Sequence, residues 1–320
     1  MSDDPAATEL GRRFAELVAG GPLPLPGAGA TPRRWRRLAE VAAEDLALAK
    51  LYESHADALA IQAELAAAPP PAGSSWAVWA AEPPQARLAV RPAADGVTLH
   101  GRKAWCSGAR TVSHALVTGW TDDGEQQLVA VRLTEPGIAV HEGSWQAVGM
   151  GRVDTPDLTF DGVPGVPVGR PGGYLDRPGF WHGGCGIAAC WYGGALPLAR
   201  AVLARVADRD DPHAAAHLGQ LDVALRSVRA LLAETAGWID AHPAAPAAEA
   251  ALRLRAAADG TARRVLDLAG RALGAGPLCR DRAVARQFAD LPVFIRQTHA
   301  ERDLAELGRA VAATGAGWQL

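Results

Sequence analysis

The hydrophobic period of this sequence changes twice, and this change limits the folds open to the chain. Apolar residues recur at helical spacing from Trp35 to Ala49, until the run Pro69-Pro70-Pro71-Ala72-Gly73 ends the helical part. A period of two then holds to about Phe160, and the helical period returns after Phe180. A chain of 320 residues suits two or three packed units. The sequence therefore predicts an α+β multidomain protein.

The first predicted part, residues 1–72, is a helical segment. Residues 5–19 read as a short amphipathic helix, and Gly20–Ala30 is a loop rich in glycine and proline. Thr31-Pro32 resembles a helix start, with threonine as the N-cap and proline at the first helical position. A helix or helix pair is expected from there to about Ala68.

The second predicted part, residues 73–178, is a small antiparallel β-sandwich or barrel. Short segments rich in β-branched and aromatic residues are separated by turn signals such as Asp122-Asp123-Gly124. Gly162–Pro178 is expected to be a loop that leaves this part. The expected strands are Ser75–Ala81, Arg87–Arg91, Gly96–Gly101, Ala104–Ser107, His114–Trp120, Gln127–Leu133, Gly137–His141 and Val153–Phe160.

The third predicted part, residues 179–320, is an up-and-down four-helix bundle. Four helical patterns with short connections pack in this way. Gly183–Arg200 is the most apolar stretch, and we interpret it as a buried core helix rather than a membrane span. The four helices are expected at 180–208, 211–241, 247–273 and 282–313.

Charge and cysteine usage narrow the function classes. The net charge is −3, which argues against a nucleic-acid-binding surface. The first residues, MSDDPAATELGRRF, lack the basic and apolar regions of a secretory signal, so a cytoplasmic protein is expected. The cysteine spacing fits neither a zinc site nor a disulfide framework. We therefore expect no bound metal, and we expect the cysteines to be buried free thiols. The cysteines are Cys106, Cys185, Cys190 and Cys279.

Three motifs in the β-rich part resemble the acyl-CoA dehydrogenase family. Trp79-Ala80-Ala81-Glu82-Pro83 is similar to the family's Thr-Glu-Pro turn beside the flavin. The stretch from Leu99 to Ala109, LHGRKAWCSGA, is similar to its G-x-K-x-W signature. Val148-Gly149-Met150-Gly151-Arg152, with the following Leu158-Thr159-Phe160, resembles a third block. The order of helical segment, β-domain and four-helix bundle is also that of the family.

The resemblance implies a flavoprotein that binds FAD. It places Ala81 beside the flavin, Trp105 against its ring and the Ser107 hydroxyl at its edge. Gly270–Gly276 matches a family segment that approaches the cofactor's phosphates, which implies contacts from Gly274 and Gly276. The matching glutamine is absent, however, and Ala215–Gly219 lacks the arginine that contacts the pyrophosphate in relatives.

The resemblance also implies a carboxylate base near the last helix, and this sequence departs from the family there. The matching position falls on Gln297 or Thr298, and neither is an acid. Substitutes nearby are His299 and Glu301, which we take as candidate catalytic residues, with His182 as a further histidine. Each also has a plain structural interpretation, as a packed histidine or as part of a solvated charged patch.

Three functions therefore stay open. The first is an acyl-CoA dehydrogenase-like oxidoreductase acting on an acyl thioester or a related small molecule. The second is a flavin-dependent monooxygenase on the same fold, which needs no α-proton base. The third is a non-catalytic or heteromeric subunit that has lost the base and part of the FAD site. The resemblance implies a homo-oligomer or hetero-oligomer and allows an electron-transfer partner.

Overall fold

The computed structural model describes residues 5–315 and 317–318, which fall into two compact units. The first unit spans Met1–Leu23 and Ala47–Phe180, and the second spans Pro24–Leu46 and Trp181–Leu320. The N-terminal helical segment that the sequence predicts is thus shared between the units. Its middle part packs against helix α5 (Gly179–Asp208) of the bundle. The contact of Gly193 with Ala39 is so close that a Cβ at residue 193 would collide with the Ala39 carbonyl, which requires glycine there.

The predicted helix or helix pair after residue 31 is a pair. Helix α1 is Pro5–Ala19, α2 is Thr31–Glu44 and α3 is Leu46–Glu64. The break between α2 and α3 falls at Asp45, whose backbone is extended (φ −162°). On the first unit's side, Ala58 and Ile61 of α3 are fully buried in a core with Trp76 and Leu116 of the β-domain. This packing explains why α3 is apolar around much of its surface.

Thr31 is not the N-cap that the sequence predicts, because Ala30 occupies that position and Thr31 is already helical. The Thr31 hydroxyl instead donates to Asp240 Oδ1 at 2.6 Å and accepts from the Gly27 amide at 2.9 Å. Thr31 therefore links the start of α2 to helix α6 (Pro212–Ala241) through Asp240, and it does not cap its own helix.

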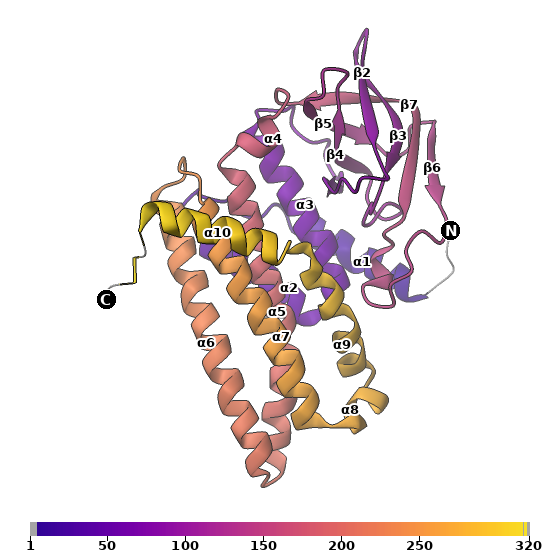
Figure 1. Cartoon of the computed structure of the whole chain (residues 1–320). Helices are drawn as coiled ribbons and strands as arrows, with labels where there is room; N and C mark the ends of the chain where they lie inside the picture. The colour runs from indigo at the N-terminus through magenta and orange to yellow at the C-terminus, as the bar shows by residue number, and fades with distance from the viewer. Residues whose placement is uncertain (1–4, 316, 319–320) are drawn as a thin grey trace. The chain divides into compact units, whose positions relative to one another are not determined.

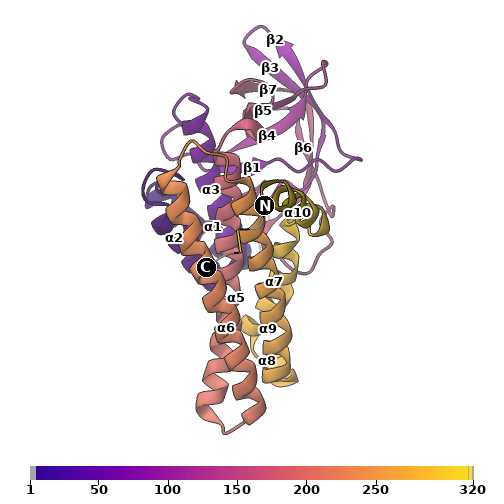
Figure 2. The same ribbon diagram turned by 60° about the vertical axis from the view of Figure 1, so that its left-hand side comes forward.

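Within the described residues, seven strands form a barrel-like sheet, labelled β1 to β7 in Figure 1 and Figure 2. The ring runs β4–β2–β3–β7–β5 and closes through β4–β5, while β1 adds to β4 and β6 to β7. The pairs β1–β4 and β2–β4 are parallel, and the other pairs are antiparallel. The strands are β1 Trp76–Trp79, β2 Leu88–Ala93, β3 Gly96–Lys103, β4 His114–Trp120, β5 Gln126–Arg132, β6 Ile138–His141 and β7 Asp157–Val168.

Three predictions for the β-domain are wrong. Ala104–Ser107 is a loop, because the backbone of Trp105 is left-handed (φ 57°) and leaves the ladder. The strand predicted at Val153–Phe160 begins only at Asp157, after a 3-10 turn at Gly151–Val153. It then continues to Val168, into the predicted loop Gly162–Pro178. Strand pairing of β7 with β3 and β5 and the burial of Val163 and Val168 outweigh the glycines and prolines there.

The second unit is built on helices α5 Gly179–Asp208, α6 Pro212–Ala241 and α7 Ala248–Leu273, which lie side by side in Figure 1 and Figure 2. The fourth predicted helix, 282–313, is broken in two. Helix α9 is Arg282–Phe294 and α10 is Glu301–Thr314, with a 3-10 turn at Ile295–Gln297 between them. Thr298 is extended and Ala300 has φ 47°, so the helical path cannot continue. The shorter helices are α4 Gly173–Asp176 and α8 Ala275–Arg280.

Helix α5 is long and apolar enough to cross a membrane by length and composition alone, and 61% of its most apolar window is buried in the structure. It is the one such helix in the described part of the chain. Cys185, Cys190 and Trp191 are fully buried on it, as the prediction of a core helix requires. The prediction of buried thiols also holds for Cys106, whereas Cys279 is exposed.

Candidate functional site

The loop between β3 and β4 presents the two residues that the sequence motif singles out. The Trp105 side chain is large and apolar, yet half of the residue is exposed. Its left-handed backbone is held by a hydrogen bond from the Trp105 amide to Asp157 Oδ1 at 3.1 Å. The half-buried Ser107 accepts a hydrogen bond on its Oγ from the Thr155 hydroxyl at 3.3 Å. This loop therefore carries an exposed indole and, two residues on, a half-buried hydroxyl that is hydrogen-bonded to the buried Thr155.

The end of β1 is bound to this loop. The indole nitrogen of Trp79, which is nearly fully buried, donates to the Ser107 carbonyl at 3.1 Å. Ala81 follows Trp79 by two residues and is half-buried. The Trp79 indole thus links the end of β1 to the loop of Trp105 and Ser107. The flavin contacts that the resemblance implies for Ala81, Trp105 and Ser107 stay predictions.

A buried ion pair joins the end of β3, just before this loop, to the segment that follows β1. Lys103 is 2% exposed, and its Nζ lies 3.2 Å from Glu82 Oε1. The ammonium also donates to the carbonyl and hydroxyl oxygens of Thr118 at 2.7 and 2.8 Å. The Thr118 hydroxyl in turn donates to Glu82 Oε1 at 2.6 Å. Glu82 and Lys103 lie within the sequence motifs, but no role was predicted for either. They meet because Lys103, at the end of β3, and Glu82, just beyond β1, both contact Thr118 of β4.

Burial sets the protonation of the groups around this pair. Desolvation lowers the pKa of Lys103, although the Glu82 carboxylate favours the charged ammonium. Desolvation raises the pKa of the Cys106 thiol, which donates to the Lys103 carbonyl at 3.3 Å. Cys106 is therefore an inert packed thiol and not a nucleophile at neutral pH. The second carboxylate oxygen of Glu82, Oε2, is buried and has no hydrogen-bond partner in the described residues.

The two glycines predicted to approach a phosphate lie in the second unit, at the end of α7. Gly274 has φ 67° and ends α7, which is an ordinary use of glycine after a helix. Gly276 is exposed in α8, and a Cβ there would meet no atom within 4 Å. Neither position is required to be glycine by a close packing contact, so backbone at both is open to a ligand.

The position that matches the family's base lies at the break between α9 and α10. The Gln297 carbonyl accepts from Arg255 Nη2 at 2.9 Å, and Arg255 Nη1 donates to the Gly184 carbonyl at 3.1 Å. The guanidinium also lies over the Trp191 ring, 5.1 Å from its centroid. Arg255 therefore ties α5 and α7 to this break. Sequence analysis missed it, although an arginine within the apolar run from Ala251 to Ala258 is a usable signal.

The substitute residues proposed for the base lie just beyond this break. The His299 side chain is 60% exposed, and its Nδ1 lies 3.3 Å from Asp303 Oδ1. The His299 amide donates to the other oxygen of the same carboxylate at 3.0 Å. Glu301 is exposed, and His182 is buried at the start of α5. Asp303 thus orients the imidazole of His299 and leaves its Nε2 available to another molecule. Sequence analysis had placed Asp303 only in a charged patch.

Comparison with known proteins finds the same fold in several solved structures. KijD3, in complex with FMN and dTDP-3-amino-2,3,6-trideoxy-4-keto-3-methyl-D-glucose, is 19% identical, with a TM-score of 0.77. That likeness covers 98% of this chain and 95% of KijD3. TdsC from Paenibacillus sp. A11-2, in complex with FMN and indole, is 19% identical with a TM-score of 0.77, covering 97% of this chain and 96% of TdsC.

Butyryl-CoA dehydrogenase from Megasphaera elsdenii is 18% identical with a TM-score of 0.74, covering 86% of this chain and 80% of that one. No protein-family model matches the sequence, and no curated protein matches it. The structural likeness extends over most of the chain and confirms the predicted fold.

Proposed function

On the premise of the acyl-CoA dehydrogenase fold that this chain has, we propose that it is a flavin-dependent oxidoreductase acting on a small molecule by monooxygenase-type chemistry. The observation that carries the flavin assignment is the loop of Trp105 and Ser107, fixed by the buried Lys103–Glu82 pair. The observation that favours oxygen chemistry is the lack of an acid at both Gln297 and Thr298. The fold alone assigns no activity, so these residues have to be tested directly.

The residues on the first unit fit an isoalloxazine ring. An exposed indole gives a flat apolar face for stacking, and hydroxyls beside it can hydrogen-bond the polar edge of the ring. Trp105 and Ser107 would hold that group, with Ala81 at the neighbouring turn. When bound, the flavin supplies two-electron redox chemistry that no amino-acid side chain provides.

FMN is the flavin that we propose, rather than FAD. The FAD expected from the family resemblance needs phosphate contacts from the bundle, and Ala215 and Gly270 stand where relatives carry an arginine and a glutamine. KijD3 and TdsC are both described with FMN. FMN carries one phosphate where FAD carries two and an adenosine, so FMN needs fewer phosphate contacts. Gly274 and Gly276 stay predictions as phosphate contacts.

Proton transfer in this proposal falls to His299, oriented by Asp303. Histidine changes its charge near neutral pH and serves as a general acid or base without a raised carboxylate pKa. A monooxygenase places one atom of dioxygen on its substrate and releases the other as water, at the expense of a two-electron reductant. It has no need to remove an α-proton, so Gln297 is compatible with it. The reductant would come from a reductase partner.

Dehydrogenation of an acyl thioester is the second candidate, since butyryl-CoA dehydrogenase shares the fold. The two are separated with FMN-loaded protein under argon. Loss of the flavin's visible absorbance on adding butyryl-CoA would favour dehydrogenation. Our proposal expects no change with wild type and a gain of bleaching in Gln297→Glu, which restores the carboxylate. Bleaching by wild type would exclude the oxygen chemistry as the main activity.

The role of His299 is tested with a reductase, oxygen and an oxidisable probe such as indole. His299→Ala is expected to lower product formation at least about tenfold, in keeping with the loss of a general acid or base. Glu306→Ala is the control at an exposed position of α10 that has no assigned role, and little change is expected there. Equal rates for wild type and His299→Ala would remove the histidine from the mechanism.

A further inference from the structure

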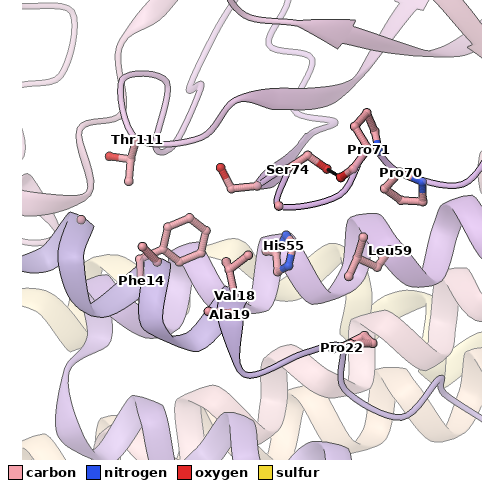
Figure 3. A pocket seen from close by; sticks show the side chains of 14 residues that line it. Phe14, Val18, Ala19, Pro22, His55, Leu59, Pro70, Pro71, Ser74 and Thr111 are labelled. Atoms are coloured by element: carbon pink, nitrogen blue, oxygen red, sulfur yellow. Dashed lines mark hydrogen bonds between the residues drawn. The ribbon is translucent and has the colours of Figure 1, made fainter.

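A cavity of about 470 Å³ lies within the first unit. Its walls are α1, α3, the loop that precedes β1, and Thr111 near the end of the loop between β3 and β4, as Figure 3 shows. It borders the start of β1, whereas Trp79 and Ala81 lie at and beyond the strand's end. A volume of this size is within the usual range for small-molecule sites in proteins.

His55 is the polar group at the centre of the cavity wall (Figure 3). The residue is 5% exposed, and its Nδ1 accepts a hydrogen bond from the Trp76 amide at 3.2 Å. A neutral imidazole that accepts at Nδ1 carries its proton on Nε2. The Phe14 ring packs edge-on against the imidazole, with centroids 6.1 Å apart. His55 is therefore a fixed donor with a defined tautomer.

Most of the rest of the lining is apolar or already hydrogen-bonded, and Thr111 adds one half-buried hydroxyl group. Phe14, Val18 and Leu59 give hydrophobic walls. The Ser74 hydroxyl donates to the Pro71 carbonyl at 2.6 Å and accepts from the Trp76 indole at 2.8 Å. Among the described residues that line the cavity, none carries a charged side chain. Burial also lowers the pKa of His55 to about 4, so the ring stays neutral at physiological pH.

We propose that this cavity is a second binding site, for a neutral and mostly apolar molecule that carries one hydrogen-bond acceptor, such as an aryl ketone. The acceptor meets the Nε2–H of His55, and the apolar body lies between α1 and the loop before β1. An anion is disfavoured, because the lining offers no cation to compensate a buried charge. A plain hydrocarbon leaves the buried donor without a partner, which also disfavours it.

The test compares two probes of similar shape, acetophenone and ethylbenzene, of which the first alone has an acceptor. The full-length protein carries ¹⁵N in its histidine rings, and the His55 signal is the one missing from His55→Gln. Acetophenone is expected to shift the Nε2 resonance of His55. It should also bind about fivefold more tightly than ethylbenzene, a difference that corresponds to one neutral hydrogen bond.

Blocking the cavity from α1 leaves His55 in place. Ala15 is exposed and lines the cavity, so Ala15→Trp is expected to remove acetophenone binding. Glu16 is the next residue, exposed and outside the lining, so Glu16→Trp is the matched control and should bind as wild type does. The proposal is overturned by absent binding, by equal affinity for ethylbenzene, or by a loss that both tryptophan variants share.

Discussion

The ammonium of Lys103 lies 3.2 Å from Glu82 Oε1, and both groups share the hydroxyl of Thr118. Lys103 ends β3 just before the loop of Trp105, and Glu82 follows Ala81 beyond β1. One buried ion pair thus fixes the relative position of the two segments that the proposed function assigns to the flavin. A buried pair of this kind gives more to geometric definition than to net stability.

Removing one partner of this pair should be costly. Lys103→Met keeps the length of the side chain but leaves the Glu82 carboxylate without its counter-charge in a mostly buried site. We expect a loss of about 3 kcal/mol in the free energy of unfolding, measured by urea denaturation. The double variant Lys103→Met with Glu82→Gln should recover part of that loss. A single variant within about 0.5 kcal/mol of wild type would contradict this account of the pair.

Helix α5 depends on glycine where it meets α2. Gly193→Ala should destabilise the protein by about 1–3 kcal/mol, because the new methyl group collides with the Ala39 carbonyl. Gly237→Ala is the matched change within α6, where a Cβ meets no atom within 4 Å, and it should stabilise by about 0.5–1 kcal/mol through helix propensity. Thermal unfolding of both variants measures the contrast, and the same sign for both would refute it.

His55 should make stability fall with acid. Its pKa drops from the ordinary value of 6.5 to about 4 on folding, so the unfolded chain binds the proton more readily between these values. The free energy of unfolding is unaffected by His55 above pH 6.5. It decreases by about 3 kcal/mol as the pH falls from 6.5 to about 4, because the unfolded chain takes up the proton first. Comparing wild type with His55→Gln across this range isolates the effect. Parallel stability curves for the two proteins would show that His55 does not contribute it.

Ser107 should contribute a hydrogen bond to the flavin edge. Ser107→Ala is expected to weaken FMN binding about fivefold, the value of one neutral hydrogen bond. Ser107→Thr keeps the hydroxyl and should bind FMN close to wild type. Isothermal titration of FMN measures both affinities. Equal affinities for the alanine and threonine variants would place the hydroxyl away from the flavin.

Periodic elements were the most predictable part of the fold. The strand His114–Trp120 and the helix of residues 5–19 have the bounds that the sequence predicts, because alternation and amphipathic spacing persist over their whole length. The loop of Trp105 was not predictable as a loop. Its apolar residues resemble a short strand, and the left-handed backbone depends on a hydrogen bond to Asp157, which is distant in sequence.

The candidate site was predictable only where a motif carried it. Trp105 and Ser107 follow from the family signature, and their contact with a flavin stays a prediction. The structure adds the hydrogen bond from the Trp79 indole to the Ser107 carbonyl. The break of the last predicted helix near Thr298 was missed because the residues from Arg282 to Thr314 keep a helical pattern throughout. Asp303 stands four residues after His299, a local spacing at which the two side chains can meet. Arg255 acts through the carbonyl of Gln297, which is distant in sequence, so its partner could not be predicted from a local pattern.

Titration of the purified chain with FMN and with FAD, followed by quenching of flavin fluorescence, tests the central proposal most directly. The account predicts saturable binding of one FMN per chain, tighter than that of FAD. Trp105→Ala should weaken it at least about tenfold, a loss of about 1.4 kcal/mol. Trp318→Ala, at a tryptophan that is 85% exposed, should leave it unchanged. Binding of neither flavin, or equal FMN affinity for wild type and Trp105→Ala, would contradict the account.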